Sequence, residues 1–507
     1  YIFTVLLLLP MACKAQDKKD SPEYTLVTYN VENLFDADGI AIYDDYNTSD
    51  KDGNDLYTET DVLTKVKNAV HVLQQYNDGK GPDIAVIVEL ESDYTPNDSG
   101  KKLTYVEFLD KYKDTTLDEM LGANFSDEIA DLPSDLLLLK GMHDAGMWNY
   151  ELVSGDSPKD NKGKPTTVQK TAVYSRFPIL TEKTKVHPLY RARPILEAWV
   201  NVDGKELAVF ANHWKSGASS AEMEEIRVQN AKVLRTRLDE LVADNEFVDF
   251  VLAGDFNSDY NQKARYDFKT SAVNDVLKSD GNEGEFFQED GSEVYNHWFE
   301  APINERVSDS YRGYWGTLMQ LMVSKGMYDT RCIYYVDNSL ERGDFGFNTF
   351  SSSGEPKRWS STFTGSGYSD HLPISMKFKV GESTQENPKF IESAAFSTND
   401  DDKWNPIAVQ YSLPTTFYTK DDVETSEITN NATYYDSYFY LSATVNGQYD
   451  LVIDGKTFDM YTPAFNPKEV FEGLKKTGKK FLFYGRLSQY RGNWQFIIES
   501  PDFVVVE

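Results

Sequence analysis

Residues 249–259 constrain the fold of this chain more than any other stretch, because an apolar segment runs directly into a polar turn there. Residues 250–253, Phe-Val-Leu-Ala, form the short apolar run that is typical of a strand buried on both faces. Gly254 interrupts this strand, and a carboxylate at Asp255 and a carboxamide at Asn257 follow it. In extended backbone, side chains two residues apart project to the same side. We therefore expect Asp255 and Asn257 to face one cleft.

This pair of polar groups has a chemical use. Asp255 can accept a proton from water while Asn257 donates hydrogen bonds to an oxyanion, a combination suited to hydrolysis of a phosphate ester. The alternative is an ordinary strand followed by a turn rich in Asp and Asn. The ends of the other strands decide between these interpretations.

Other apolar segments also end in polar residues. Strands are expected at residues 25–36, 82–91, 171–178, 195–202, 207–216, 311–324 and 375–380, and helices at 61–76, 132–147 and 221–241. The polar residues at strand ends are Asn30, Glu32, Glu89, Asn212, His213, Asp370 and His371. Strands that alternate with helices and carry acids at their ends are the layout of an α/β sandwich whose active site lies at one edge of its sheets.

Several nearby charged residues have a simpler interpretation. We expect three acids to be solvated neighbours of these motifs: Asp36, Glu91 and Asp259. Three cations could steer a phosphate, namely Arg176, Lys215 and Arg312. A lone cation near a cleft, however, usually lies at the surface.

The chain is too long for one compact unit, since 507 residues correspond to two or three domains of usual size. The polar run 381–388 has no apolar period and marks the start of a linker. Beyond it Tyr, Thr and Val dominate, and short strands are expected at 438–445, 448–453, 480–487 and 494–498. Their lengths and turns indicate a small β barrel.

The net charge of −31 indicates a protein that repels polyanions over most of its surface. Tight, nonspecific binding of nucleic acid normally needs the opposite sign of charge. A metal-dependent enzyme escapes this objection, because bound divalent cations reverse the local field where the phosphate binds.

The first residues resemble an export signal. The apolar run 1–9 is too short to span a bilayer, and it is followed by small residues up to Cys13 and then by a polar segment. Ala12-Cys13 resembles a bacterial lipoprotein box, in which the cysteine carries a lipid anchor after cleavage. The competing interpretation is cleavage after Ala15 and free secretion. We expect export in either case, to the cell envelope (periplasm or cell surface) or to the medium.

The strand-end motifs, taken together and in this order, resemble those of the endonuclease/exonuclease/phosphatase family, which are DNase-like, metal-dependent phosphoesterases. The resemblance covers roughly residues 24–380 and implies an α+β fold with a four-layered α/β/β/α sandwich. The segment 481–501 resembles the OB-type barrels that are appended to secreted nucleases. We therefore expect four regions: an export signal and leader (1–20), a catalytic domain (21–380), a linker (381–403) and an OB-like β domain (404–507).

The resemblance implies how the site holds metal and phosphate. Glu89 would be the principal ligand of Mg²⁺ or Mn²⁺, assisted by Glu32. Asn30 would lie beside the metal and the phosphate, and Asn212 would also bind phosphate. A hard cation of this kind takes few carboxylates, keeps waters, and neutralises charge on the pentacoordinate phosphate.

Five residues would have catalytic roles by the same resemblance. Asp255 would orient or deprotonate the attacking water, and Asn257 would hold the scissile phosphate. His213 matches the histidine of the DNase and sphingomyelinase branch. His371 would contact a phosphate oxygen, with Asp370 near the metal or the leaving group.

The chain departs from the family pattern at one position. The strand before the last motif normally carries an Asp that hydrogen-bonds the final histidine, but the aligned residue here is Met319. Methionine cannot usefully accept this bond, so His371 would lose its orienting partner. Three explanations stay open: reduced activity, another acid in its place, or a shifted alignment.

These observations predict an exported metal-dependent phosphodiesterase, and most specifically a nuclease that acts on nucleic acid or another phosphodiester. The alternatives are a phosphatase or lipid phosphodiesterase for small esters, or a binding protein with a degraded site. In the last domain, Tyr490, Arg491 and Trp494 could stack on single-stranded nucleic acid, or they could pack the barrel. No protein partner is evident from the sequence.

Overall fold

The computed structural model of the chain describes residues 22–43, 46–47, 56–92, 103–161, 165–266, 268–280, 293–301, 306–311, 314–328, 332–350, 354–360, 366–381, 417–420, 422–428, 434, 437–463, 465–490 and 492–506. The predicted export signal and leader, with Cys13, and the predicted linker beyond residue 381 lie outside these residues.

The first sheet contains the strands nearest the N-terminus. Its order is β14-β16-β1-β2-β4-β3, and β15 pairs with β16. The strands are β1 (Glu23–Leu34), β2 (Ile84–Glu91), β3 (Glu151–Gly155), β4 (Gln169–Ser175), β14 (Ile333–Tyr335), β15 (Glu341–Arg342) and β16 (Ile374–Val380). Because β1 and β2 are parallel, their carboxyl ends meet at the same edge of the sheet.

The second sheet has the order β5-β6-β7-β8-β13-β10-β9. Its strands are β5 (Lys185–His187), β6 (Ile195–Val202), β7 (Lys205–His213), β8 (Phe250–Asp255), β9 (Ser279–Asp280), β10 (Val294–Asn296) and β13 (Met319–Val323). Here too the central pair, β7 and β8, is parallel. A separate two-stranded sheet consists of β11 (Asp309–Tyr311) and β12 (Tyr314–Gly316). The single core strand expected at 311–324 is therefore wrong, because only its last third is a core strand and the aromatic first part belongs to this hairpin.

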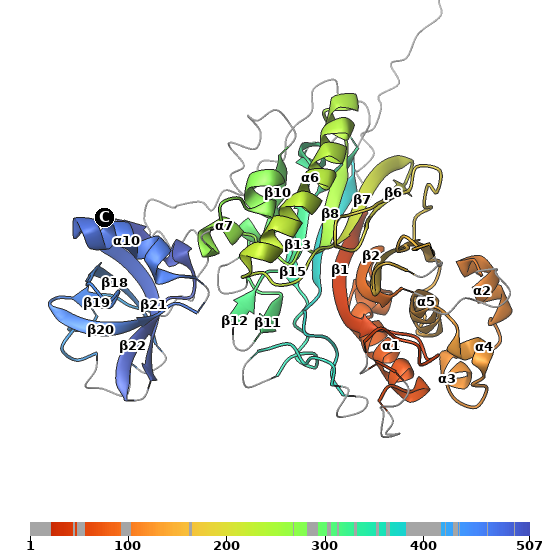
Figure 1. Cartoon of the computed structure of the whole chain (residues 1–507), viewed down its shortest axis with the longest axis horizontal. Helices are drawn as coiled ribbons and strands as arrows, with labels where there is room; N and C mark the ends of the chain where they lie inside the picture. The colour runs from red at the N-terminus through yellow and green to blue at the C-terminus, as the bar shows by residue number, and fades with distance from the viewer. Residues whose placement is uncertain are drawn as a thin grey trace, which may run out of the picture.

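Helices lie against the outer faces of both sheets (Figure 1). Those on the first sheet's side are α1 (Glu59–Leu73), α2 (Tyr105–Lys111), α3 (Leu117–Met120), α4 (Asp127–Ala130) and α5 (Ser134–Asp144). Those on the second sheet's side are α6 (Ala221–Asp244), α7 (Gln262–Arg265) and the π-helical turn η3 (Ala272–Val276). Shorter 3-10 turns are η2 (Asn77–Gly79), η4 (His297–Phe299), η6 (Lys325–Tyr328) and η8 (Pro501–Phe503). The three long helices expected from apolar periodicity are confirmed as α1, α5 and α6, with ends shifted by a few residues.

Alternation along the strands divides the apolar residues of these two sheets and their helices into three buried clusters. Within β7, Leu207, Val209 and Ala211 pack toward the first sheet, whereas Ala208 and Phe210 pack toward α6. A further cluster joins β1, β2 and β4 to α1 and α5. The central cluster thus holds the two sheets face to face, which brings their strand ends together.

The C-terminal region forms a closed five-stranded barrel. Its strands are β18 (Tyr438–Val445), β19 (Leu451–Ile453), β20 (Lys456–Tyr461), β22 (Asn493–Ile497) and β21 (Phe481–Tyr490), and pairing of β18 with β21 closes it. Two short strands flank it, β17 (Phe417–Tyr418) and β23 (Val504–Val506). The four predicted strands are confirmed in approximate position as β18, β19, β21 and β22, whereas β20 and the two flanking strands were not predicted. The expectation of an all-β domain is wrong in one respect, since the helix α10 (Pro467–Thr477) lies between β20 and β21.

The barrel lies beside α7 in Figure 1, and polar contacts join it to the loop after β8. The Tyr260 hydroxyl donates to Asp502 Oδ2 at 3.1 Å, and Arg306 Nη1 donates to the Tyr260 oxygen at 2.7 Å. The Arg306 guanidinium also lies 5.0 Å from the centre of the Tyr260 ring. The C-terminal region therefore contacts the loop after β8, close to the turn that carries Asp255 and Asn257.

In the described part of the chain, we find no helix that is both long and apolar enough to cross a membrane.

Gly254 is required by the close approach of β7 and β8. Its φ of +133° is unfavourable for side chains, and an added Cβ would lie 2.0 Å from the backbone oxygen of Asn212. We expect Gly254→Ala to lower the free energy of unfolding by more than about 3 kcal/mol, measured by denaturant titration. Gly204→Ala is the matched control, because Gly204 has a φ of +86° with nothing within 4 Å and should cost about 1 kcal/mol. Equal costs for the two variants would contradict the steric argument.

Candidate active site

The carboxyl ends of four strands converge on one cluster of titratable groups. Ligand atoms of Glu89 from β2, His213 from β7 and Asp255 from β8 all lie within 4.8 Å of one another. His213 Nε2 is 3.6 Å from Glu89 Oε1 and 3.8 Å from Asp255 Oδ2. Asn30, from β1, joins this group through its amide, which donates to Glu89 Oε1 at 3.0 Å and to Asp255 Oδ2 at 3.1 Å. Residues separated by up to 225 positions in the sequence thus share one site.

Irregular backbone aims the acids of the first sheet. Glu89 lies inside β2 yet has a φ of +66°, and the pairing of β2 shifts register around it. Glu32 and Asn33, with φ of +48° and +59°, mark a similar shift at the end of β1. Bulges of this kind re-aim side chains beside active sites. The Asn33 N–H then donates to Glu89 Oε2 at 3.0 Å, which fixes the second carboxylate oxygen.

Asp255 and Asn257 are adjacent, but through a tight turn and not through extended backbone. β8 ends at Asp255, and Asn257 has a φ of +47°. The Asn257 N–H donates to Asp255 Oδ1 at 2.8 Å, while its side-chain amide donates to the Trp214 carbonyl at 3.1 Å. The expectation that both project from one strand is therefore wrong. The turn instead leaves Asp255 Oδ2 facing the two histidines and Asn30.

His371 completes the cluster from the loop before β16. Its Nε2 lies 3.7 Å from Asp255 Oδ2 and 3.8 Å from Asp370 Oδ1. Ser369 anchors this loop, because its hydroxyl donates to the Asn30 carbonyl at 2.7 Å and accepts the His371 N–H at 3.1 Å. The Asp370 side chain is one-third exposed and faces the outer side of the cluster.

The pKa values of the two histidines shift in opposite directions. Burial, together with the positive charges of Arg193 and His371, lowers the pKa of His213 well below its usual range, so its ring is neutral. Burial also lowers the pKa of His371, but the surrounding acids, first Asp370 and Asp255, raise it to about 9. A neutral imidazole can ligate a metal, whereas an imidazolium donates a hydrogen bond to an anion. The cluster thus offers both functions.

Glu32 lies at the edge of this cluster and faces different partners. Its carboxylate accepts from Arg358 Nη2 at 3.0 Å and from the Trp359 N–H, and its backbone oxygen accepts from Lys65 Nζ at 2.6 Å. Burial, followed by repulsion from Asp370, raises the pKa of Glu32 to about 7. Its predicted role as a metal ligand beside Glu89 stays a prediction.

Asn212 uses its amide within the chain. Its Nδ2 donates to the Phe210 carbonyl at 2.8 Å, and its Oδ1 accepts from Trp214 Nε1 at 3.1 Å. These bonds hold the turn after β7 and thereby the position of His213. The predicted contact of Asn212 with phosphate also stays a prediction.

Two arginines that sequence reasoning missed lie beside the cluster. Arg193 donates to the Trp214 carbonyl at 3.0 Å, and its charge favours ionisation of Glu89 and Asp255. Arg358 is exposed and lies 4.0 Å from Asp370. A signal for Arg193 was available in the basic run 191–193, which directly precedes a core strand. Both cations are suited to attract a phosphate.

The charged neighbours named from the sequence have different outcomes. Arg176 lies 3.7 Å from Asp83 and 4.9 Å from the centre of the Tyr150 ring, so it belongs to a structural contact. Arg312 lies outside the described residues. The prediction that three acids are solvated is wrong, since each is buried: Asp36, Glu91 and Asp259. Backbone N–H groups that need acceptors explain this, as in the bond from Asp36 N to Glu91 Oε2 at 3.0 Å.

The cluster meets the requirements of a divalent-cation site. Two carboxylates and a neutral imidazole within one small volume are ligands that divalent cations accept. Burial, followed by repulsion from Asp370, raises the pKa of Glu89, as expected for acids gathered without a counterion. Glu89, His213 and Asp255 are therefore the residues that would hold the ion.

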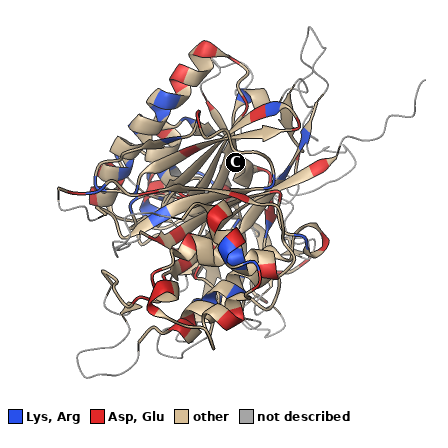
Figure 2. Cartoon of the chain, turned by 90° about the vertical axis from the view of Figure 1, so that its right-hand side faces the viewer, with Lys and Arg blue, Asp and Glu red and all other residues tan. Residues whose placement is uncertain are grey.

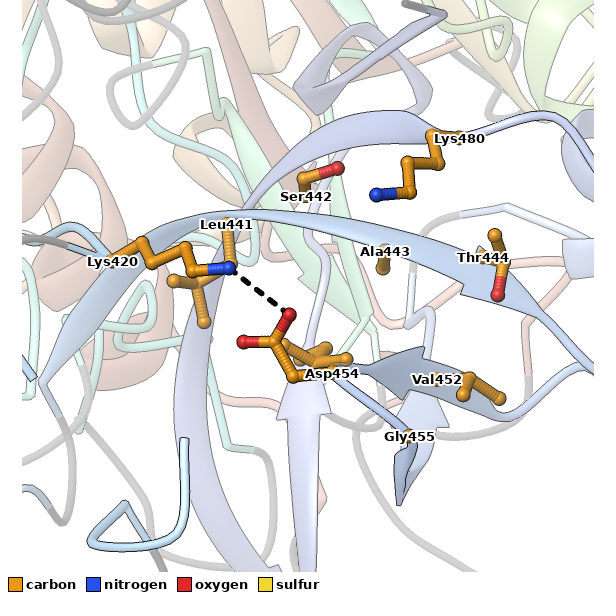
Figure 3. A pocket seen from close by; sticks show the side chains of 10 residues that line it. Lys420, Leu441, Ser442, Ala443, Thr444, Val452, Asp454, Gly455 and Lys480 are labelled. Atoms are coloured by element: carbon orange, nitrogen blue, oxygen red, sulfur yellow. Dashed lines mark hydrogen bonds and ion pairs between the residues drawn. The ribbon is translucent and has the colours of Figure 1, made fainter. Parts of the chain in front are cut away.

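A second cavity lies in the C-terminal barrel, of about 270 Å³, where β18 and β19 separate. Figure 3 shows Lys420 and Lys480 on either side of it, with Asp454 bonded to Lys420 Nζ at 3.1 Å. Asp454 also lies within the electrostatic influence of Lys480. This carboxylate offsets part of the positive charge of the two lysines.

Two parallel strand pairs, packed face to face with acids and histidines at one edge, define a phosphoesterase-like α+β protein. The family model described as Endonuclease/Exonuclease/phosphatase family matches residues 135–380, and this region of the chain belongs to that family. The matched region carries His213, Asp255 and His371, and the structure adds Asn30 and Glu89 from the strands before it.

Solved structures of the same family are similar to this chain. TDP2 from C. elegans has a TM-score of 0.37 and 13% sequence identity, covering 71% of this chain and 77% of that one. A family protein from Leptotrichia buccalis has a TM-score of 0.37 and 14% sequence identity, covering 70% of this chain and 99% of that one. A family protein from Bacteroides vulgatus has a TM-score of 0.36 and 13% sequence identity, covering 71% of this chain and 99% of that one. No curated protein matches the chain.

Proposed function

We propose that this chain is a metal-dependent phosphodiesterase and that its substrate is nucleic acid. The observation that carries the proposal is the convergence of Glu89, His213 and Asp255 with His371 and Asn30 at the edge of two packed sheets. The resemblance of the motifs supports a nuclease in particular. We also propose the four-layered sandwich for the catalytic domain, supported by one apolar cluster between the sheets and one on each outer side.

Each group of the site would have a separate role in hydrolysis. A cation held by the three-residue cluster would neutralise charge on the phosphate and polarise it toward attack. Asp255, as a ligand of the same cation, would orient the attacking water toward the phosphate. The His371 imidazolium would donate to a phosphate oxygen on which charge develops. Asn30, which already donates to Glu89 and Asp255, would keep the two carboxylates aligned.

We further propose that the protein is exported and carries a lipid anchor at Cys13, as the sequence of its first residues suggests.

Removal of metal is expected to abolish activity. The full chain should convert supercoiled plasmid DNA to the open circle in the presence of Mg²⁺ or Mn²⁺. Excess EDTA should stop this conversion, because protein groups alone leave the phosphate charge uncompensated. Adding back Mg²⁺ in excess of EDTA should restore it, which separates chelation from loss of the fold. Plasmid cleavage that is insensitive to EDTA would contradict the proposal.

A second candidate function is hydrolysis of small phosphate esters, favoured by the acidic surface. Asp and Glu number 82 against 51 Lys and Arg, and Figure 2 shows acidic residues over the outer helices of the catalytic domain. Release of inorganic phosphate from small esters, without cleavage of plasmid DNA, would support this function. Metal binding without turnover of either substrate would point to a binding protein with a degraded site.

A further inference from the structure

His371 lies in the site without the acid that its sequence motif leads one to expect. Met319, at the expected position, is fully buried on β13 and offers only a thioether. His371 Nε2 faces Asp255 and Asp370, while its buried Nδ1 has no hydrogen-bond partner among the described residues. A buried imidazole in a site of this kind is normally held in one orientation by a neighbouring acid. Met319 therefore leaves His371 without the orienting acid of its motif.

A buried acid, Asp309, lies on the strand paired with His371. It lies on β11, is only 6% exposed, and is paired with His371 in an isolated antiparallel bridge. The bridge is held by the Leu372 N–H, which donates to the Ser308 carbonyl at 2.6 Å. Asp309 therefore lies on the strand directly beside the histidine, although 62 residues separate the two positions.

Hydrogen bonds fix the Asp309 carboxylate next to Met319. Its Oδ1 accepts from the Ser308 hydroxyl at 2.9 Å and from the Leu318 N–H at 3.0 Å. The same Ser308 hydroxyl accepts the Met319 N–H at 3.1 Å. The Ser308 hydroxyl therefore links the Asp309 carboxylate to the backbone of Met319, the position where the motif normally has its acid.

The opposing strand leaves room for this carboxylate. Gly316 is the pairing partner of Asp309, and a Cβ at Gly316 would lie 2.4 Å from Asp309 Oδ2. A glycine at this position lets the carboxylate lie over the hairpin. The charge interaction agrees with the geometry: burial raises the pKa of Asp309 to about 6, and the positive charge of His371 counteracts that rise.

We propose that Asp309 is a positioning residue that supplies, from the β11–β12 hairpin, the negative charge behind His371 that is absent at Met319. This inference rests on the proposed function, because it assigns Asp309 a role in phosphoester cleavage through His371. It explains how the site keeps an oriented histidine despite the departure from the family motif.

The test is a mutant cycle on the full chain. Asp309→Asn keeps the size of the side chain and is expected to lower kcat by about 10-fold to 100-fold with little change in KM. Met319→Asp alone should change kcat little, because the acid is already supplied. In the Asp309→Asn background, Met319→Asp should restore most of the lost kcat, which a merely structural role of Asp309 would not predict.

Controls make each outcome decisive. Asp249→Asn removes another buried acid of the same sheet pair, whose Oδ2 accepts the Ile333 N–H at 2.9 Å, and should lower Tm without lowering kcat. Unchanged kcat in Asp309→Asn would overturn the inference. So would a gain in kcat from Met319→Asp that is as large in the wild-type background as in the Asp309→Asn background. Absence of metal-dependent cleavage in the wild-type chain would instead overturn the proposed function.

Discussion

Glu89→Gln is expected to lower kcat for plasmid cleavage by at least about 10³-fold, the largest effect of any single substitution in this site. The amide has the size of the carboxylate but no charge to hold a divalent cation. It would also present a donor to Asn30 or Asn33, both of which donate to Glu89. Calorimetric titration with Mn²⁺ should show that this variant no longer binds the ion, independently of any turnover.

Glu91→Gln is the matched control for this experiment. Glu91 belongs to the same strand, and burial raises its pKa to about 8, so it is largely protonated at neutral pH. Replacing a neutral carboxylic acid with an amide changes no charge, and kcat should remain close to the wild-type value. If Glu89→Gln retained wild-type activity and Mn²⁺ binding, the cluster would not be the metal site.

The strand ends could be predicted because the signal is local. A run such as 250–253 identifies a buried strand without reference to the rest of the chain, and the polar residue after it lies at the sheet edge by geometry alone. Parallel pairing of β7 with β8 then brings His213 beside Asp255, which the fold class already implied. The cluster of Glu89, His213 and Asp255 is the result.

The contributions of loops and hairpins could not be predicted in this way. Arg358 reaches Glu32 across 326 residues, and Asp309 pairs with His371 through an isolated bridge. The positive φ of Glu89 also leaves no mark in the sequence, because glutamate does not favour it. Such features depend on tertiary packing, which outweighs local propensity.

Helix α10 was predictable and was missed. Asn466 caps its first turn, Pro467 is its first residue, and Gly478 ends it with a left-handed φ of +64°. These are the start and stop signals of a helix. The segments on both sides are rich in strand-forming residues and favour an all-β interpretation. The capping residues are a more specific local signal than this overall composition.

His371→Gln is expected to lower kcat by about 10²-fold to 10³-fold. The wild-type side chain, with a pKa of about 9, is an imidazolium at neutral pH and donates to the developing charge on phosphate. Raising the pH through 9 removes this proton, so wild-type kcat/KM should fall on the alkaline side. A glutamine does not titrate, and the variant should therefore lack this alkaline decrease, which a pH–rate profile measures.

His143→Gln provides the comparison, because its side chain is 41% exposed at the end of α5, where Nδ1 lies 3.7 Å from Asp144 Oδ1. It should stay within about twofold of wild-type kcat and keep the alkaline decrease. An alkaline decrease that persists unchanged in His371→Gln would assign it to another group, such as metal-bound water. Since His213 is neutral over this whole range, the decrease distinguishes the two histidines: only the one held among Asp370, Asp255 and Asp309 carries a proton that alkali can remove.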